Sequence, residues 1–353
     1  MKKAFAALLL VVAGCGGQSS PMPVADYGAP PAGVPLIYLG DPEHPGWYDG
    51  FDWTGKARGT IKLDAPPDQY RSLIQAPDGS AFLLKPFKAL GGQYYDRFGR
   101  PIGQPFTAGA RIAWGDDSRE LCVLDGFRGA WSIGVTTPHG TSSTLHAVAI
   151  DPAIAKSGIL AIDFAACSPG NDRAVLAYSF SGRPTQIYVV RISDGGILFE
   201  RTYPANMLAD ITSSSDGVLY AENSNSSTGY LMDGAAPNTF VRRTADASAV
   251  ATLDRTYGVL AFSSGDSVAL VSTSPWASGV ETHLALVRIS DGKVLWSYDG
   301  REEYAGGWVQ PNGSDMAVML QSPYDQSPHA SVSVVILQAD GKSTAIPGKY
   351  VRA

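Results

Sequence analysis

Short apolar segments alternate with turn-forming residues along most of this chain. Segments such as "AFLLKP" (81–86), "QIYVVRIS" (186–193) and "LALVRIS" (284–290) are bounded by residues rich in Gly, Asp and Pro. Their alternation of apolar and polar positions predicts strands, and no convincing helical period follows the N-terminal apolar run. The chain is therefore expected to be all-β.

Two classes of turn separate these segments. The first recurs about every 45 residues and includes "RISDGG" (191–196) and "RISDGK" (288–293). Its members are 53–56, 97–100, 138–141, 193–196, 290–293, 339–342 and a degenerate copy at 245–248. The second class lies at 76–79, 115–118, 168–171, 214–217, 263–266 and 310–313. Asp, Asn and Gly predominate because hairpin turns need a positive φ or a side chain that bonds its own backbone.

The two turn classes define one repeating unit of strand, Asp/Gly turn, strand, variable loop, strand, Gly turn and strand. Four antiparallel strands in about 45 residues form one blade of a β-propeller. Residues 36–353 are predicted to form the propeller, most simply with seven four-stranded blades, six or eight being alternatives. The first three strands have no innermost strand before them, and 349–353 is a short leftover strand. Pairing of these ends is expected to close the ring and hide its edges.

The N-terminus predicts export rather than part of the fold. Lys2 and Lys3 precede an apolar run too short to span a bilayer, which ends in "VAGC" at 12–15. This resembles the lipobox of bacterial lipoproteins, which implies cleavage after residue 14 and lipidation of Cys15; an ordinary signal peptide with a chance Cys is the alternative. Residues 15–35, rich in Pro, Gly and Ser, are interpreted as the lipidated Cys and a disordered tether.

The turn and strand rhythm also resembles known bacterial propellers. "SDGKVLW" at 290–296 is similar to the repeats of TolB-like and quinoprotein-like propellers. The resemblance implies the fold strongly and the function weakly. The Trp of the quinoprotein repeat is missing at 195–199 and 341–345, so no quinone or other cofactor is predicted.

Charge and cysteine content narrow the function classes. The chain has 27 Lys and Arg, 33 Asp and Glu and a net charge of −6. No basic run is present, which argues against nucleic-acid binding. Cys122 and Cys167 remain after Cys15; in an exported protein they can form a disulfide, or each can pack as a small hydrophobic residue.

Catalytic chemistry is not indicated by any motif. The five His residues are scattered, and the two that share one turn and strand, His139 and His146, have no Asp or Glu at metal-ligand spacing, so no metal site is predicted. Adjacent carboxylates such as Asp116 and Asp117 are interpreted as solvated turn residues, because neighbouring side chains in a turn point apart. The catalytic residues of any activity are unknown at this stage.

The long loops are the remaining candidate for function. In a propeller, the loops between blades and those between second and third strands share one face, whereas the opposite face carries short turns with little contact area. Aromatic and Arg side chains on irregular loops are typical of binding surfaces. The candidates are Tyr70, Tyr203, Arg255, Tyr257, Trp276, Arg301, Tyr304, Tyr324 and His329.

These observations favour a binding or scaffolding module over an enzyme. The expected protein is a monomer, lipid-anchored on the extracytoplasmic side of a bacterial envelope, the outer membrane where there is one. Its expected partner is an envelope protein or a glycan. The alternative is an enzyme with an active site in the axial funnel: a lyase, a glycosidase-like hydrolase or a quinone-dependent dehydrogenase.

Overall fold

The fold is that of an all-β propeller. The computed structural model describes residues 36–44, 46–63, 71–86, 92–106, 111–127, 130–138, 144–150, 162–178, 184–204, 210–223, 238–254, 257–272, 282–311, 313–322 and 331–351. In these residues it has 27 strands and one 3-10 helix, η1 (Pro169–Asn171). None of the described segments forms a helix with the length and hydropathy needed to cross a bilayer.

Five four-stranded antiparallel sheets form most of the ring. The first two contain β4 (Arg71–Gln75), β5 (Ala81–Pro86), β6 (Gly92–Asp96), β7 (Pro101–Phe106), β8 (Arg111–Trp114), β9 (Leu121–Phe127), β10 (Ala130–Thr136) and β11 (His146–Val148). The next two contain β12 (Ile162–Ser168), β13 (Arg173–Tyr178), β14 (Thr185–Arg191), β15 (Ile197–Tyr203), β16 (Asp210–Ser213), β17 (Leu219–Asn223), β18 (Asn238–Arg243) and β19 (Ala249–Asp254). The fifth contains β20 (Gly258–Phe262), β21 (Val268–Ser272), β22 (Thr282–Arg288) and β23 (Val294–Gly300).

The remaining strands form a single seven-stranded sheet in the order β24-β25-β26-β27-β1-β2-β3. They are β24 (Glu303–Val309), β25 (Met316–Gln321), β26 (Ser331–Leu337), β27 (Ser343–Val351), β1 (Ile37–Gly40), β2 (Trp47–Phe51) and β3 (Ala57–Lys62). One residue pair, Gly40 with Val351, joins β1 to β27.

The prediction of seven four-stranded blades closed by a shared blade is thus not supported, because five sheets have four strands and one has seven. The expected separate strand at 349–353 does not begin where predicted. Its described residues, 349–351, continue β27, where Tyr350 and Val351 pair with Val332 and Ser331 of β26 beyond a bulge.

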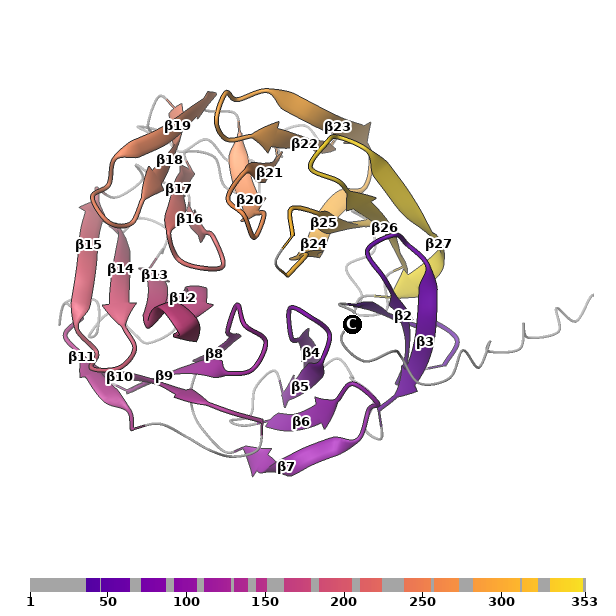
Figure 1. Ribbon diagram of the computed structural model, residues 1–353, viewed down its shortest axis with the longest axis horizontal. Coiled ribbons are helices and arrows are strands. Elements are labelled where there is room, and N and C mark those ends of the chain that lie inside the picture. Colours follow the sequence, from indigo (N-terminus) through magenta and orange to yellow (C-terminus); the bar gives the residue numbers. More distant parts are fainter. Residues whose placement is uncertain are drawn as a thin grey trace, which may run out of the picture.

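Figure 1 shows the sheets arranged around a central axis, with β4, β8, β16, β20 and β24 nearest the centre and β7, β15, β19, β23 and β27 at the rim. Buried apolar side chains fill the spaces between successive sheets. One cluster, for example, joins Leu176 and Val190 to Ile133 of the preceding sheet. Packing of sheet faces against each other buries the apolar positions of each strand and places the polar turns at the two ends of the ring.

The repeated phrase "RISDG" forms the same turn in two sheets. In each copy the Gly N–H donates to the carbonyl of the Arg, at 2.9 Å for both Gly195 and Gly292. The Asp carboxylate accepts from a backbone N–H two residues on, and its other oxygen lies 2.6 Å (Asp194) or 2.9 Å (Asp291) from the guanidinium of the same Arg. The phrase is therefore a turn signature rather than a functional motif.

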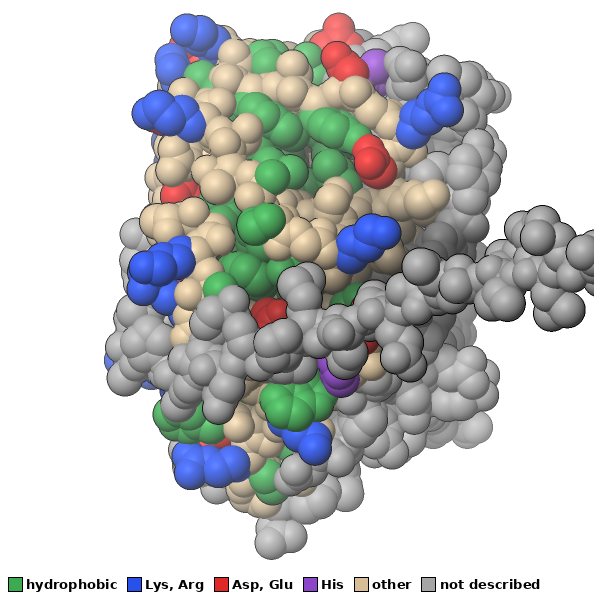
Figure 2. Space-filling view, turned by 90° about the vertical axis from the view of Figure 1, so that its right-hand side faces the viewer, with side chains coloured by type: hydrophobic (Ala, Val, Ile, Leu, Met, Phe, Trp, Pro, Cys, Tyr) green, Lys and Arg blue, Asp and Glu red, His purple; other side chains and the backbone are tan. Residues whose placement is uncertain are grey.

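The outer edge of the ring is seen in Figure 2, from the side that carries β3 and β27 in Figure 1. Hydrophobic side chains gather in the upper part of this view, and Lys and Arg lie mostly toward its borders (Figure 2). Charged residues near exposed strand edges discourage pairing with other chains.

Candidate functional site

The register of the strands separates the molecule into two ends with different loops. In the sheet β12–β15, Ile162 pairs with Tyr178, Tyr178 with Gln186, and Thr185 with Tyr203. These positions adjoin the connections between sheets and the connections between second and third strands. We call the end of the ring that carries these connections the long-loop end. The opposite, short-turn end carries both classes of Asp/Gly turn.

Four of the predicted binding residues are described, and all belong to the long-loop end. Tyr203 ends β15, Tyr257 precedes β20, Arg301 follows β23, and Tyr304 is the second residue of β24. They come from three different sheets. Cys15, Tyr70, Arg255, Trp276, Tyr324 and His329 lie outside the described residues.

Tyr203 is not presented to solvent, contrary to its expected role as a surface contact. Its side chain is 2% exposed, and its hydroxyl donates to Oε1 of Glu222 at 2.5 Å. Arg201 and Arg242 lie 3.2 Å and 2.5 Å from the same oxygen. Burial and the bond to Glu222 raise the pKa of Tyr203. These three side chains provide hydrogen-bond and ion-pair partners for the buried carboxylate of Glu222 between β15 and β17. Their role is therefore structural.

The other three described residues retain some exposure. Arg301 is exposed, and Tyr257 and Tyr304 are partly buried against apolar clusters. The carbonyl of Tyr257 accepts from Oγ1 of Thr239 at 2.6 Å, which ties the start of β20 to the preceding sheet. A backbone position fixed in this way loses little entropy when a partner binds.

The short-turn end holds a pocket that sequence analysis missed. It has a volume of about 210 Å³, and its lining includes Pro77, Asp116, Ser215, Ser264 and Trp308. These residues come from the inner turns or strands of five sheets, whose hairpin tips lie around the centre in Figure 1. A second pocket of about 200 Å³ shares Pro77, Asp116 and Ser215. We call the two together the axial pocket.

Hydrogen bonds between neighbouring turns hold the wall of the axial pocket. Asp78 N–H donates to Oγ of Ser118 at 3.0 Å, and Asp116 N–H donates to the carbonyl of Cys167 at 3.0 Å. Ser264 Oγ donates to the carbonyl of Gln310 at 2.6 Å. Each bond links one sheet to the next, so these turns support one another rather than forming independent loops.

Asp116 is the only carboxylate in the described lining of the axial pocket. Oδ2 accepts from Ser168 Oγ at 2.7 Å, and Ser168 in turn accepts from Nδ2 of Asn171 at 2.9 Å. Oδ1 is buried and has no hydrogen-bond partner among the described residues. Burial raises the pKa of Asp116, and the charges of Asp117 and Asp216 raise it further, against the Ser168 bond.

Asp117, by contrast, behaves as the sequence predicted. It is exposed, and its Oδ1 accepts from the backbone N–H groups of Arg119 at 3.0 Å and Glu120 at 3.4 Å. The two adjacent carboxylates therefore have different roles. Only the convergence of turns from several sheets distinguishes them, and no local sequence signal carries that information.

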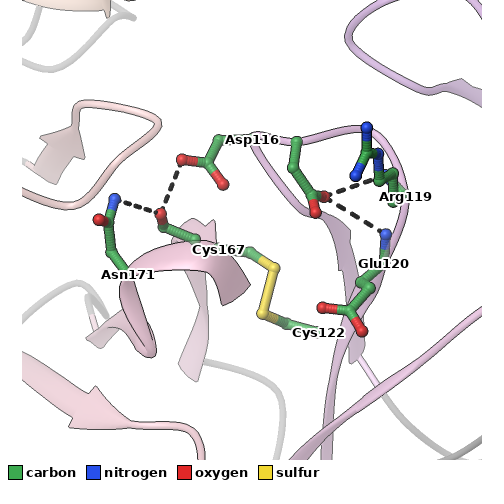
Figure 3. The surroundings of a disulfide bond; sticks show 8 residues. Asp116, Arg119, Glu120, Cys122, Cys167 and Asn171 are labelled. Atoms are coloured by element: carbon green, nitrogen blue, oxygen red, sulfur yellow. Dashed lines mark hydrogen bonds between the residues drawn. A yellow bond between two sulfur atoms is a disulfide. The ribbon is translucent and has the colours of Figure 1, made fainter.

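A disulfide joins Cys122 of β9 to Cys167 of β12 next to this wall (Figure 3). Both residues are buried in the apolar cluster between the two sheets. Of the two alternatives left open by the sequence, the structure has the covalent one. Within the described part of the chain, no group of three or more His, Cys, Asp or Glu is arranged to hold a metal ion.

Comparisons with known proteins agree on the fold and go no further. No family model matches the chain, and no curated protein matches it. Among solved structures, an uncharacterized protein from Listeria monocytogenes is 12% identical with a TM-score of 0.51, over 83% of this chain and 87% of that one. Hsv2 of Kluyveromyces lactis is 11% identical with a TM-score of 0.50, over 89% of this chain and 96% of that one. A putative TolB from Agrobacterium tumefaciens is 13% identical with a TM-score of 0.42, over 90% of each chain.

Proposed function

We propose that this protein is a binding or scaffolding propeller of the bacterial envelope that holds a protein or glycan through its long-loop end. The observation that carries the proposal is the shared location of Tyr257, Arg301 and Tyr304 at that end, on successive parts of the ring. Aromatic and Arg side chains supply large contact area and directional donors, and they dominate the energetics of many interfaces.

An extracytoplasmic location is part of the proposal. The apolar run before Cys15 supplies the argument from sequence, with lipidation of Cys15 as the anchor. The disulfide between Cys122 and Cys167 supplies an independent argument, because such bonds persist mainly in oxidising compartments.

We also propose that the ring counts seven blades, with β1–β3 as a blade distinct from β24–β27. Two separate apolar clusters support this count. One packs Ile37 and Leu39 against Val334, and the other packs Tyr38 and Tyr48 against Phe82 of the next sheet. An averaged electron-microscopy view down the axis is expected to have seven radial lobes; six lobes would contradict the count.

The binding role is tested by capture of envelope proteins and glycans on the tagged full-length chain, taken from detergent-solubilised membranes. Trp276→Ala, Tyr324→Ala and Arg301→Ala are expected to weaken capture of any specific partner at least tenfold. Arg119→Ala is the matched control, because Arg119 is exposed at the short-turn end. Capture that survives all three substitutions, or that fails only with Arg119→Ala, would refute the choice of end.

A further inference from the structure

We propose that the axial pocket binds a small aliphatic amine, whose ammonium group pairs with Asp116 and whose carbon chain lies against Trp308. This proposal does not depend on the partner proposed for the long-loop end. It concerns the opposite end of the ring and different residues.

The pocket is preorganised before any ligand arrives. Its wall is made by inner turns that are hydrogen-bonded from sheet to sheet, through Ser118, Cys167 and Gln310. A rim fixed in this way does not have to be ordered on binding, which removes a large part of the entropic cost of association. A volume of about 210 Å³ suits a small molecule rather than a folded partner.

The charge of the wall favours a cation. Asp116 uses one oxygen for Ser168, and the other has no partner among the described residues. Asp116 belongs to the lining of both parts of the pocket, so the ammonium group of the ligand is placed against its carboxylate. Among ion pairs between described residues, none involves Asp116, Asp216 or Asp266.

The neighbouring carboxylates strengthen this preference. Burial raises the pKa of both Asp116 and Asp266; the charges of Asp117 and then Asp216 raise it further at Asp116, and the charge of Asp216 raises it further at Asp266. The ionised carboxylates at this end therefore repel one another, and a bound ammonium group would reduce this repulsion. The side chain of Arg173 packs beside Gly217, the residue next to Asp216. It forms no ion pair with another described residue.

The apolar part of the wall limits the ligand to an amine with a carbon skeleton. Trp308, Pro77 and Pro311 line the pocket, and Trp308 is only partly buried. An indole ring attracts an ammonium group through its π-face and packs well against methylene groups. A fully hydrated metal cation gains nothing from these side chains.

The test is calorimetric titration of the purified full-length chain with 1,4-diaminobutane at pH 8 and low salt. Binding is expected for the wild type and is expected to weaken about tenfold or more in Asp116→Asn, which keeps the acceptor for Ser168. Trp308→Leu is expected to weaken binding severalfold. Asp340→Asn is the matched control, because it removes an exposed charge that lies outside the lining; the affinity of this variant should stay within threefold.

Two further titrations define the chemistry. 1,4-Butanediol, which has the same skeleton without charge, should not bind. Nα-Acetyl-lysine methylamide distinguishes the sources of the amine: tighter binding than the diamine assigns the site to a lysine side chain of a peptide, and weaker binding assigns it to a free amine. Lack of diamine binding, equal binding by Asp116→Asn, or equal binding of the diol would overturn the proposal.

Discussion

Single backbone positions explain the composition of the turns. In four of the second-class turns, which form the inner turns, the fourth residue is left-handed, with φ of 70° at Gly79 and Gly217, 63° at Ser118 and 52° at Asp266; in the turn at 168–171 this conformation falls one residue later, on Asp172. In the outer turns the same conformation falls on Gly195, Gly292 and Gly341, and on Ala247 in the degenerate copy. A Cβ is strained in this conformation, which explains why Gly recurs there. Asp is also found there because its short polar side chain can form local hydrogen bonds that offset the strain.

The outer turns differ in what lies beside the glycine, and stability should differ accordingly. A Cβ on Gly195 would collide with the carbonyl oxygen of Ala147, whereas a Cβ on Gly292 meets nothing within 4 Å. Gly292→Ala is expected to lower the free energy of unfolding by about 1 kcal/mol, from backbone strain alone. Gly195→Ala should cost clearly more, because two backbones must separate. Urea unfolding checks the order, and equal losses would contradict it.

Asp266 should make stability depend on pH. Burial, and then the charge of Asp216, raises the pKa of Asp266 to about 7. The folded state therefore binds a proton that the unfolded state has lost, so stability from this group falls as pH rises from about 4 to about 7. Asp266→Asn removes this loss, and Asn also tolerates the positive φ. We expect the variant to be more stable than the wild type by about 1–2 kcal/mol at pH 8, after screening by solvent, and equal to it near pH 4.

Asp340→Asn is the control for this measurement, since Asp340 is exposed and the side chain of Lys342 lowers its pKa. Thermal unfolding at several pH values should give no gain for this control above pH 7. A gain of the same size in both variants would indicate a general effect of net charge instead of a local one.

At the scale of elements, the sequence predicted strands and turns well because both depend on short-range patterns. The alternation of apolar positions and the Asp/Gly turns are local, and β5, β14 and β22 overlap the segments that were predicted as strands. The prediction of a separate strand at 349–353 was wrong because the end of β27 depends on a contact that is distant in the sequence. Nothing between residues 343 and 351 indicates that the ladder with β26 resumes after the bulge, at Val332 and Tyr350.

The disulfide is a bond between elements, and its removal should destabilise the ring. Cys122 and Cys167 are 45 residues apart and join adjacent sheets, so the bond constrains a long loop of the unfolded chain. Cys122→Ser with Cys167→Ser is expected to lower the free energy of unfolding by about 2–4 kcal/mol. Unfolding in denaturant, with and without reductant, measures it: reductant should destabilise the wild type and leave the variant unchanged. A wild type that is equally stable with and without reductant would contradict the assignment.

At the scale of the molecule, the two ends of the ring have different chemistry. The sequence identified the long-loop end from topology, but it could not show that Tyr203 is buried against Glu222, since these residues belong to different sheets. The axial pocket was missed for the same reason. Pro77, Asp116, Ser215 and Trp308 are far apart along the chain and meet only when the ring forms.

Hydroxyl-radical footprinting of the full-length chain, with and without saturating 1,4-diaminobutane, tests most directly whether the two ends have separate roles. Oxidation of Trp308 is expected to fall severalfold with the amine, while Tyr257 and Tyr304 at the long-loop end stay unchanged. Unchanged oxidation of Trp308, or protection centred on Tyr257 and Tyr304, would contradict the account.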